Sequence, residues 1–193
     1  MIQNNIYRGL DHLKALSINS TTKQIEALDI EMKANTVYSF FNSILTDELS
    51  SLNQHTIYCD ANALSQQKQA YFIGEQLILG DVLIVGLMGM EESDANIPKE
   101  ELEKLINYDV NAFYQEVIAL LAQSDVNLYH TFEVEQDGEV LHLNAEWVLY
   151  TFDMADDRTK TYFIAELTKS LEAKEETALY LKKMAQLAIN AAR

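Results

Sequence analysis

The chain has 193 residues, 48% of them hydrophobic, which is enough apolar material for one large domain or two small ones. Thirty acidic and fourteen basic side chains give a formal net charge of −16, which disfavours direct binding to nucleic acid phosphates, because that affinity comes from Lys and Arg. With one cysteine, no signal-peptide pattern and no stretch approaching 18 apolar residues, we expect a cytoplasmic protein without disulfides or membrane spans.

Two elements are predicted near the amino terminus. Residues 16–32 predict a β-hairpin, because Leu16 and Ile18 alternate with polar residues and the polar run 19–23 indicates a turn. Residues 36–52 predict an amphipathic helix, since their apolar side chains recur at spacings of three and four. This buried face would comprise Val37, Phe40, Phe41, Ile44, Leu45, Leu49 and Leu52.

A strand is predicted next at residues 55–58, and a turn at residues 60–62. Cys59 lies between them and is expected to be a buried structural thiol. Residues 63–73 are compatible with a short helix or with an irregular crossing to the next strand.

Residues 77–87 form the densest apolar run and predict a central strand that is covered on both faces. The run contains one charge, Asp81, beside Gly80, and an isolated glycine predicts a kink or bulge there. Acidic residues follow Gly86 and Gly89, where a P-loop would have Gly-Lys-Ser/Thr. We therefore expect no nucleotide cofactor.

Pro98 predicts the start of a short helix that continues to residue 107, because the missing N–H of proline costs nothing at a first helical position. Glu100 and Glu101 would then interact favourably with the positive end of that helix.

A second unit is predicted from about Tyr108, although no Pro- or Gly-rich linker precedes it. The predicted units are residues 1–107 and 108–193, with one continuous domain as the alternative. The second unit would begin with an amphipathic helix over residues 110–125.

Asp137-Gly138 is the strongest local signal, a two-residue hairpin turn. Outward pairing gives an apolar face with the pairs Val134–Leu141, Phe132–Leu143, His130–Ala145 and Leu128–Trp147. The opposite face, expected to be solvated or to bind a partner, has the pairs Glu133–His142, Thr131–Asn144 and Tyr129–Glu146. The two histidines fall on opposite faces, so their spacing predicts no metal site.

The chain from Thr159 onward predicts helix, with a polar break at residues 174–177. Asp153, Asp156 and Asp157 precede it as a cap cluster, and they lack the glycine and final glutamate of a calcium loop. The fold class is therefore α+β: a small mixed or antiparallel sheet with packed helices, followed by a helix, a β-hairpin and a helical carboxy terminus.

The segments that carry a family resemblance are residues 13–31, 36–52, 57–62 with Cys59 and Asp60, 80–86 and 98–106. Together they resemble a family of small uncharacterised domains encoded by phages, plasmids and other mobile elements. Such domains have a hairpin, a helix, a strand ending in a Cys-Asn/Asp turn, a hydrophobic strand with flanking glycines and a short acidic helix. The resemblance implies a mobile-element origin, and no family is indicated for residues 108–193.

The excess of acidic side chains predicts a non-enzymatic interaction module for a basic protein surface. If the gene belongs to a phage or plasmid, the specific form is an inhibitor of a host nuclease or defence complex that acts as a nucleic acid mimic. The candidate contacts are Glu91, Glu92, Asp94, Glu100, Glu101, Glu103, Asp153, Asp156 and Asp157. An even spread of carboxylates would instead indicate that the charge serves solubility.

Two alternatives stay open. Residues 178–192, with Leu181, Met184 and Leu187, could form a homo-oligomer through the carboxy-terminal helices. An enzyme or small-molecule-binding protein is the other alternative, although no catalytic, cofactor or metal pattern stands out. Cys59 and Asp60 would be the first residues to mutate in that case.

Overall fold

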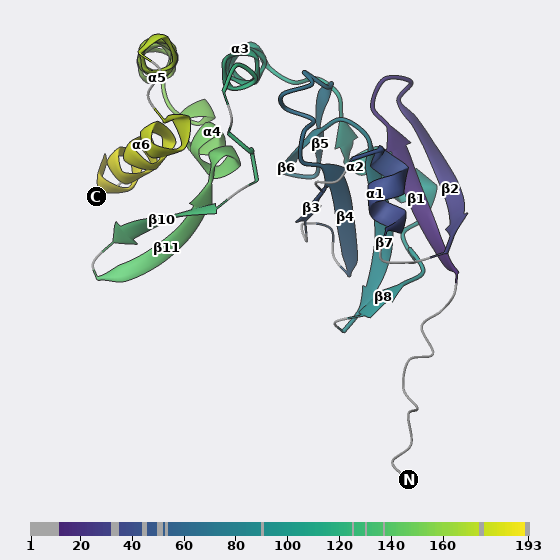
Figure 1. The fold of residues 1–193 in the computed structure, drawn as a ribbon. Coiled ribbons are helices and arrows are strands. Elements are labelled where there is room, and N and C mark those ends of the chain that lie inside the picture. Colours follow the sequence, from purple (N-terminus) through teal and green to yellow (C-terminus); the bar gives the residue numbers. More distant parts are fainter. Residues whose placement is uncertain are drawn as a thin grey trace. The chain divides into compact units, whose positions relative to one another are not determined.

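The computed structural model describes residues 12–31, 35–43, 46–49, 52, 54–89, 91–124, 126–129, 131–136, 138–173 and 176–191. These residues form six helices and three antiparallel sheets, so the predicted α+β class is confirmed (Figure 1). The chain divides into two compact units, Met1–Asp60 with Gln69–Tyr108 and Ala61–Lys68 with Asp109–Arg193. The segment Ala61–Lys68 therefore groups with the second unit, which no sequence pattern indicates.

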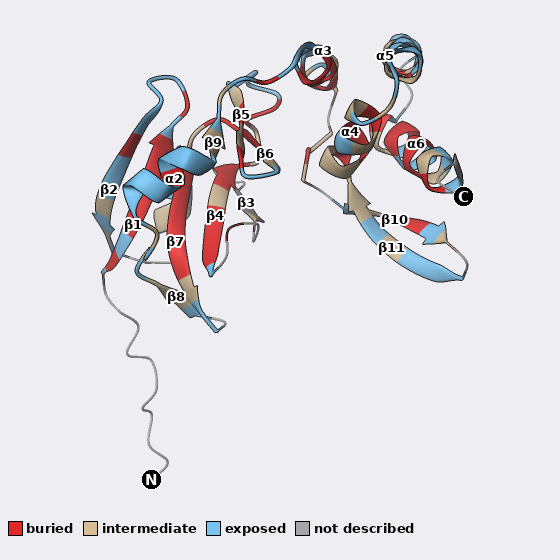
Figure 2. Ribbon diagram, turned by 180° about the vertical axis from the view of Figure 1, so that it is seen from behind, coloured by how far each residue is buried: buried red, intermediate tan, exposed pale blue. Residues whose placement is uncertain are grey.

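A six-stranded antiparallel sheet organises the first unit. Its strands run in the order β2-β1-β7-β4-β3, and β8 pairs with β7. Their bounds are β1 (Leu13–Asn19), β2 (Gln24–Ile30), β3 (Thr46–Leu49), β4 (His55–Asp60), β7 (Val82–Met88) and β8 (Glu91–Ser93). Helix α1 (Thr36–Phe41) lies on one face of this sheet and α2 (Lys99–Leu105) on the other (Figures 1 and 2). Strand β7 is central and buried from Val82 to Val85, as predicted.

The first hairpin is confirmed as β1 and β2. Ile18 pairs with Ile25, and both are buried. The connecting turn closes through the side chain of Asn19, whose Oδ1 accepts the Thr22 N–H at 2.8 Å, and Lys23 adopts a positive φ of 58°. Local polar chemistry therefore fixes this register.

The prediction of one strand over residues 77–87 is wrong, because the run is divided between two sheets. Strand β6 (Gln76–Leu79) belongs to a three-stranded sheet in the order β6-β5-β9, with β5 (Ala70–Ile73) and β9 (Ile106–Asn107). Gly80, with a φ of 75°, redirects the chain into β7. Asp81 then accepts hydrogen bonds from the N–H and Oγ of Ser20, at 2.7 and 2.9 Å.

The predicted helix over residues 36–52 is also wrong beyond its first turns. Helix α1 ends at Phe41, because Asn42 adopts a left-handed φ of 50°. Strand β3 follows, and Ile44 and Leu45 lie outside the described residues. Phe40 is 36% exposed, contrary to the predicted buried face, whereas Phe41 packs against the core of Ala15, Leu83 and Val85.

The remaining elements of the first unit differ from prediction mainly at their ends. The predicted strand 55–58 continues as β4 through Cys59 and Asp60, which are both buried, and the turn starts at residue 61. Of residues 63–73, residues 63–67 form turns, as the irregular alternative predicts. Residues 70–73 form β5, a strand that neither alternative predicted. Helix α2 begins one residue after Pro98 and ends at Leu105.

Four helices and a hairpin form the second unit. They are α3 (Ala112–Leu121), β10 (Thr131–Gln136), β11 (Glu139–Asn144), α4 (Ala145–Asp153), α5 (Asp157–Glu172) and α6 (Thr177–Ala191). Phe163 lies at their centre, with ring centroids 4.4 Å from Phe152, 6.0 Å from Phe113 and 6.2 Å from Tyr180. The predicted helix in 110–125 and the two carboxy-terminal helices are confirmed.

The second hairpin has the predicted register only up to Thr131 opposite Asn144. Beyond it the predicted strand is wrong, because the Asn144 side chain accepts the Trp147 N–H at 2.9 Å and caps α4. Ala145, Val148, Leu149 and Phe152 then form the buried face of that helix. His130 and Asp137, named in the prediction, lie outside the described residues.

Candidate protein-interaction surface

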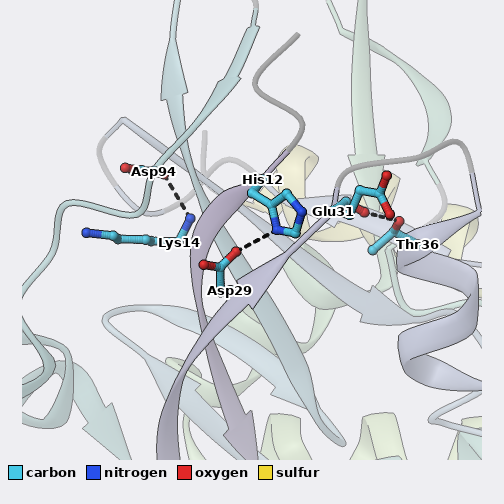
Figure 3. Close-up of polar contacts among 6 residues, drawn as sticks. All are labelled: His12, Lys14, Asp29, Glu31, Thr36 and Asp94. Atoms are coloured by element: carbon cyan, nitrogen blue, oxygen red, sulfur yellow. Dashed lines mark hydrogen bonds and ion pairs between the residues drawn. The ribbon is translucent and has the colours of Figure 1, made fainter.

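Residues 91–103, here called the acidic segment, carry six of the nine predicted contacts. The segment starts as β8, which pairs with β7 from Met88 opposite Glu91 to Gly86 opposite Ser93. It then crosses to β1, where the Asp94 Oδ1 accepts the backbone N–H of Lys14 at 2.8 Å (Figure 3). The Ala95 N–H also donates to the Lys14 carbonyl at 2.7 Å. Two strands therefore hold the start of the segment.

Gly86 permits this close crossing. A Cβ atom at residue 86 would lie 2.1 Å from the carbonyl oxygen of Asp94 and 2.7 Å from the Ser93 Oγ. Both distances are far below ordinary van der Waals contact, and the first is to backbone, which cannot rotate away. The glycine is therefore required by the acidic segment that packs over it.

His55 on β4 supplies the third attachment. Its ring is buried, and Nε2 accepts the backbone N–H groups of Asn96 and Ile97 at 3.2 and 3.3 Å. This geometry requires Nε2 to carry no proton. Sequence reasoning missed the role of His55, because its partners are 41 and 42 residues away and no local pattern links them.

Helix α2 presents the second half of the acidic segment. Leu102 is fully buried, while Glu100, Glu101 and Glu103 are exposed. Glu100 and Glu101 lie in the first turn as predicted, and Glu103 is 3.9 Å from Lys99. One apolar side chain thus anchors a helix whose other side chains face solvent.

The six carboxylates of the segment divide into two groups. Glu92 accepts a hydrogen bond from the Tyr58 hydroxyl and Asp94 holds β1, so both contribute to the fold. Asp94 is exposed as well, but its carboxylate is bound to β1. The other four exposed carboxylates, one on β8 and three on α2, are here called the acidic surface: Glu91, Glu100, Glu101 and Glu103.

The other three predicted contacts belong to the second unit and have local roles. Asp153 ends α4, pairs with Lys160 at 3.0 Å and accepts the Asn111 Nδ2 at 3.0 Å. Asp156 caps α5 by accepting the Thr159 N–H at 2.8 Å, and this backbone hydrogen bond lowers its pKa. Asp157 is exposed in the first turn of α5. The cap prediction is confirmed for Asp156.

The side chains considered for other functions are located as follows. Cys59 is fully buried and Asp60 is 9% exposed, both on β4. His142 is exposed opposite Glu133.

Across the described ranges, no three side chains of His, Cys, Asp or Glu gather as a metal site would require. Within the same ranges, no helix combines the length and apolar character needed to cross a bilayer.

The carboxy-terminal helices offer less apolar surface than the sequence indicates. Leu181 and Met184 are buried in the second unit, whereas Leu187 is 55% exposed. Two of the three side chains considered for self-assembly are thus explained by packing within one chain.

No protein-family model matches the chain, and neither a curated protein nor a solved structure matches it. The resemblance of residues 13–106 to mobile-element domains therefore stays a prediction.

Proposed function

We propose that this protein is a non-enzymatic binding protein whose acidic surface contacts a basic protein. The observation that carries the proposal is the exposure of Glu91, Glu100, Glu101 and Glu103 on a segment fastened to β7, β1 and β4. Because the backbone is held at several points, little conformational entropy is lost when a partner binds.

Charge supports the same proposal. The net charge of −16 attracts a basic partner over several ångströms, and this steering weakens as salt shortens the Debye length from about 10 Å at 0.1 M. Exposed charge pairs contribute only about 0.2–1 kcal/mol each, so the acidic surface would govern association rate and salt dependence.

The partner class we propose is a nucleic-acid-binding protein, because its basic groove complements the charge of an acidic surface. The proposed protein would inhibit it by occupying that groove, as a nucleic acid mimic. The mobile-element resemblance supports a nuclease or defence complex as the target.

The test compares two variants with equal charge change. Glu100, Glu101 and Glu103 are replaced by Gln in the first, and the exposed hairpin residues Glu133, Glu135 and Glu139 in the second. Each tagged protein is used to capture partners from host lysate at about 0.05 M and 0.5 M salt. Circular dichroism confirms that both variants are folded.

We expect the wild type and the hairpin variant to retain the same basic protein at low salt, and the α2 variant to lose it. Added duplex DNA should release the retained protein. Equal loss in both variants would show that only net charge matters, and retention by the α2 variant would refute the proposed surface. Failure of DNA to compete would refute the mimic mechanism alone.

A further inference from the structure

The second unit contains a cavity of about 270 Å³ that is separate from the acidic surface. Phe132 of β10 and Leu181 of α6 line it, together with Val126 of the loop before β10. The loop is held in place by the Tyr129 N–H, which donates to the Asn127 Oδ1 at 2.9 Å, and by the Glu146 N–H, which donates to the Leu128 carbonyl at 3.4 Å. The cavity is thus bounded by hydrogen-bonded elements.

Two small side chains leave this space open. Ala145 is the first residue of α4 and Ala178 lies in the first turn of α6, and both line the cavity. A leucine at either position would project into space that is now empty. An apolar cavity of about 150 Å³ admits benzene, so this one has room for an aromatic ring with a short chain.

The polar lining determines the ligand's charge. Glu176 is exposed and is the only ionisable side chain among the described residues that line the cavity, while Asn127 contributes an amide. The amino ends of α4 and α6 carry partial positive charges of about half a unit, which favour anions. Together the two ends would match one full charge, but Asn144 already caps α4 by accepting the Trp147 N–H at 2.9 Å. The contribution that remains is therefore smaller than the full charge of the Glu176 carboxylate, and the site favours a cation.

We propose that this cavity binds a small primary amine with a compact apolar body. The apolar body lies against Phe132, Val126 and Leu181, and the ammonium group lies near the Glu176 carboxylate. This inference goes beyond the proposed partner binding and does not depend on it.

Three probes with one apolar body test the proposal on the full chain. They are 2-phenylethylamine, its neutral counterpart 2-phenylethanol and the anionic 3-phenylpropionate. Dissociation constants come from titrations followed by amide chemical shifts. We expect the amine to bind most tightly, the alcohol more weakly and the acid weakest, with shifts centred on Ala178 and Leu181.

Three variants assign the effect to this cavity. Glu176→Gln should lower the ratio of amine to alcohol affinity roughly two- to fivefold, as for an exposed charge pair. Ala178→Leu should remove binding of all probes, while Leu179→Ala, exposed and outside the cavity, should change nothing. The proposal is overturned if no probe binds, if the acid binds best, if the ratio survives Glu176→Gln, or if a folded Ala178→Leu variant still binds. Because Glu176 is exposed, its variant keeps the test valid even if Ala178→Leu fails to fold.

Discussion

Replacing Gly86 by Ala tests whether the acidic segment depends on its close crossing over β7. The new Cβ would lie 2.1 Å from the Asp94 carbonyl oxygen, whereas ordinary contacts are about 3.4 Å or longer. The segment must therefore move by roughly 1.3 Å or more, since both sides of the contact are backbone. Gly86 does not adopt a positive φ, so its replacement adds no backbone strain of its own.

The movement would break specific hydrogen bonds. Those nearest the clash are Lys14 N–H to Asp94 and Ala95 N–H to the Lys14 carbonyl, at 2.8 and 2.7 Å. At about 0.5–1.5 kcal/mol each, with the strain of the displaced backbone, we expect the free energy of unfolding to fall by about 2–4 kcal/mol.

Urea denaturation and amide hydrogen exchange measure this effect. The Lys14 and Ala95 amides should lose protection before those of β7. Gly89→Ala is the matched control, because residue 89 has a φ of 71° and open space around it, so only a strain of about 1 kcal/mol is expected. If Gly86→Ala lowers the free energy of unfolding no more than Gly89→Ala does, and the Lys14 and Ala95 amides stay protected from exchange, the argument from close approach is refuted.

Three further predictions concern buried tyrosines and a helix cap. The hydroxyls of Tyr71 and Tyr108 are buried without a hydrogen-bond partner among the described residues. Tyr71→Phe should therefore raise the free energy of unfolding, measured by urea denaturation, by about 1 kcal/mol; a decrease would show that the Tyr71 hydroxyl has a hydrogen-bond partner in solution. Burial raises the pKa of Tyr71, Tyr114 and Tyr180 in the folded state, whereas the unfolded phenols ionise near pH 10. The free energy of unfolding should therefore hold below about pH 10 and decline above it, and equal urea unfolding midpoints at about pH 8 and 11 would contradict this. Asn144→Ala should lower the free energy of unfolding by about 1 kcal/mol, because it removes the cap of α4, whereas Asn144→Asp should stay near wild type. The fluorescence of Trp147, the single tryptophan, follows the unfolding transition, and equal losses in both variants would argue against the cap.

Local chemistry made the hairpins predictable. The turn near Gly138 and the polar turn after Asn19 each specify a conformation within a few residues. The residue at which the second hairpin ends was harder to predict, because Asn144 can continue a strand or cap a helix. Its side chain caps α4, and the apolar spacing of three and four that follows is consistent with that outcome.

The two larger errors have one cause, which is that periodicity does not reveal chain reversals. Apolar spacing over residues 36–52 fits one helix, yet Asn42 in a left-handed conformation divides it into α1 and β3. Gly80 predicts a kink within the apolar run, but not that the run divides between two sheets, where Asp81 is held by Ser20, 61 residues away. Contacts at such separation leave no local signal.

The acidic residues illustrate the same limit for function. The sequence identifies every carboxylate, but it cannot show which of them make the long-range hydrogen bonds that hold the fold. Glu92 and Asp94 act through Tyr58 and Lys14, which are 34 and 80 residues away. Tertiary structure reduces six candidates in the acidic segment to four.

The grouping of Ala61–Lys68 with the second unit matters for dividing this chain. Ala63 and Leu64 in that segment are buried, at 1% and 4% exposure. A fragment starting at Asp109 would lack both side chains and would therefore not contain the whole second unit. Proteolytic cleavage after Tyr108 would likewise divide the second unit, because Ala61–Lys68 would stay with the other piece.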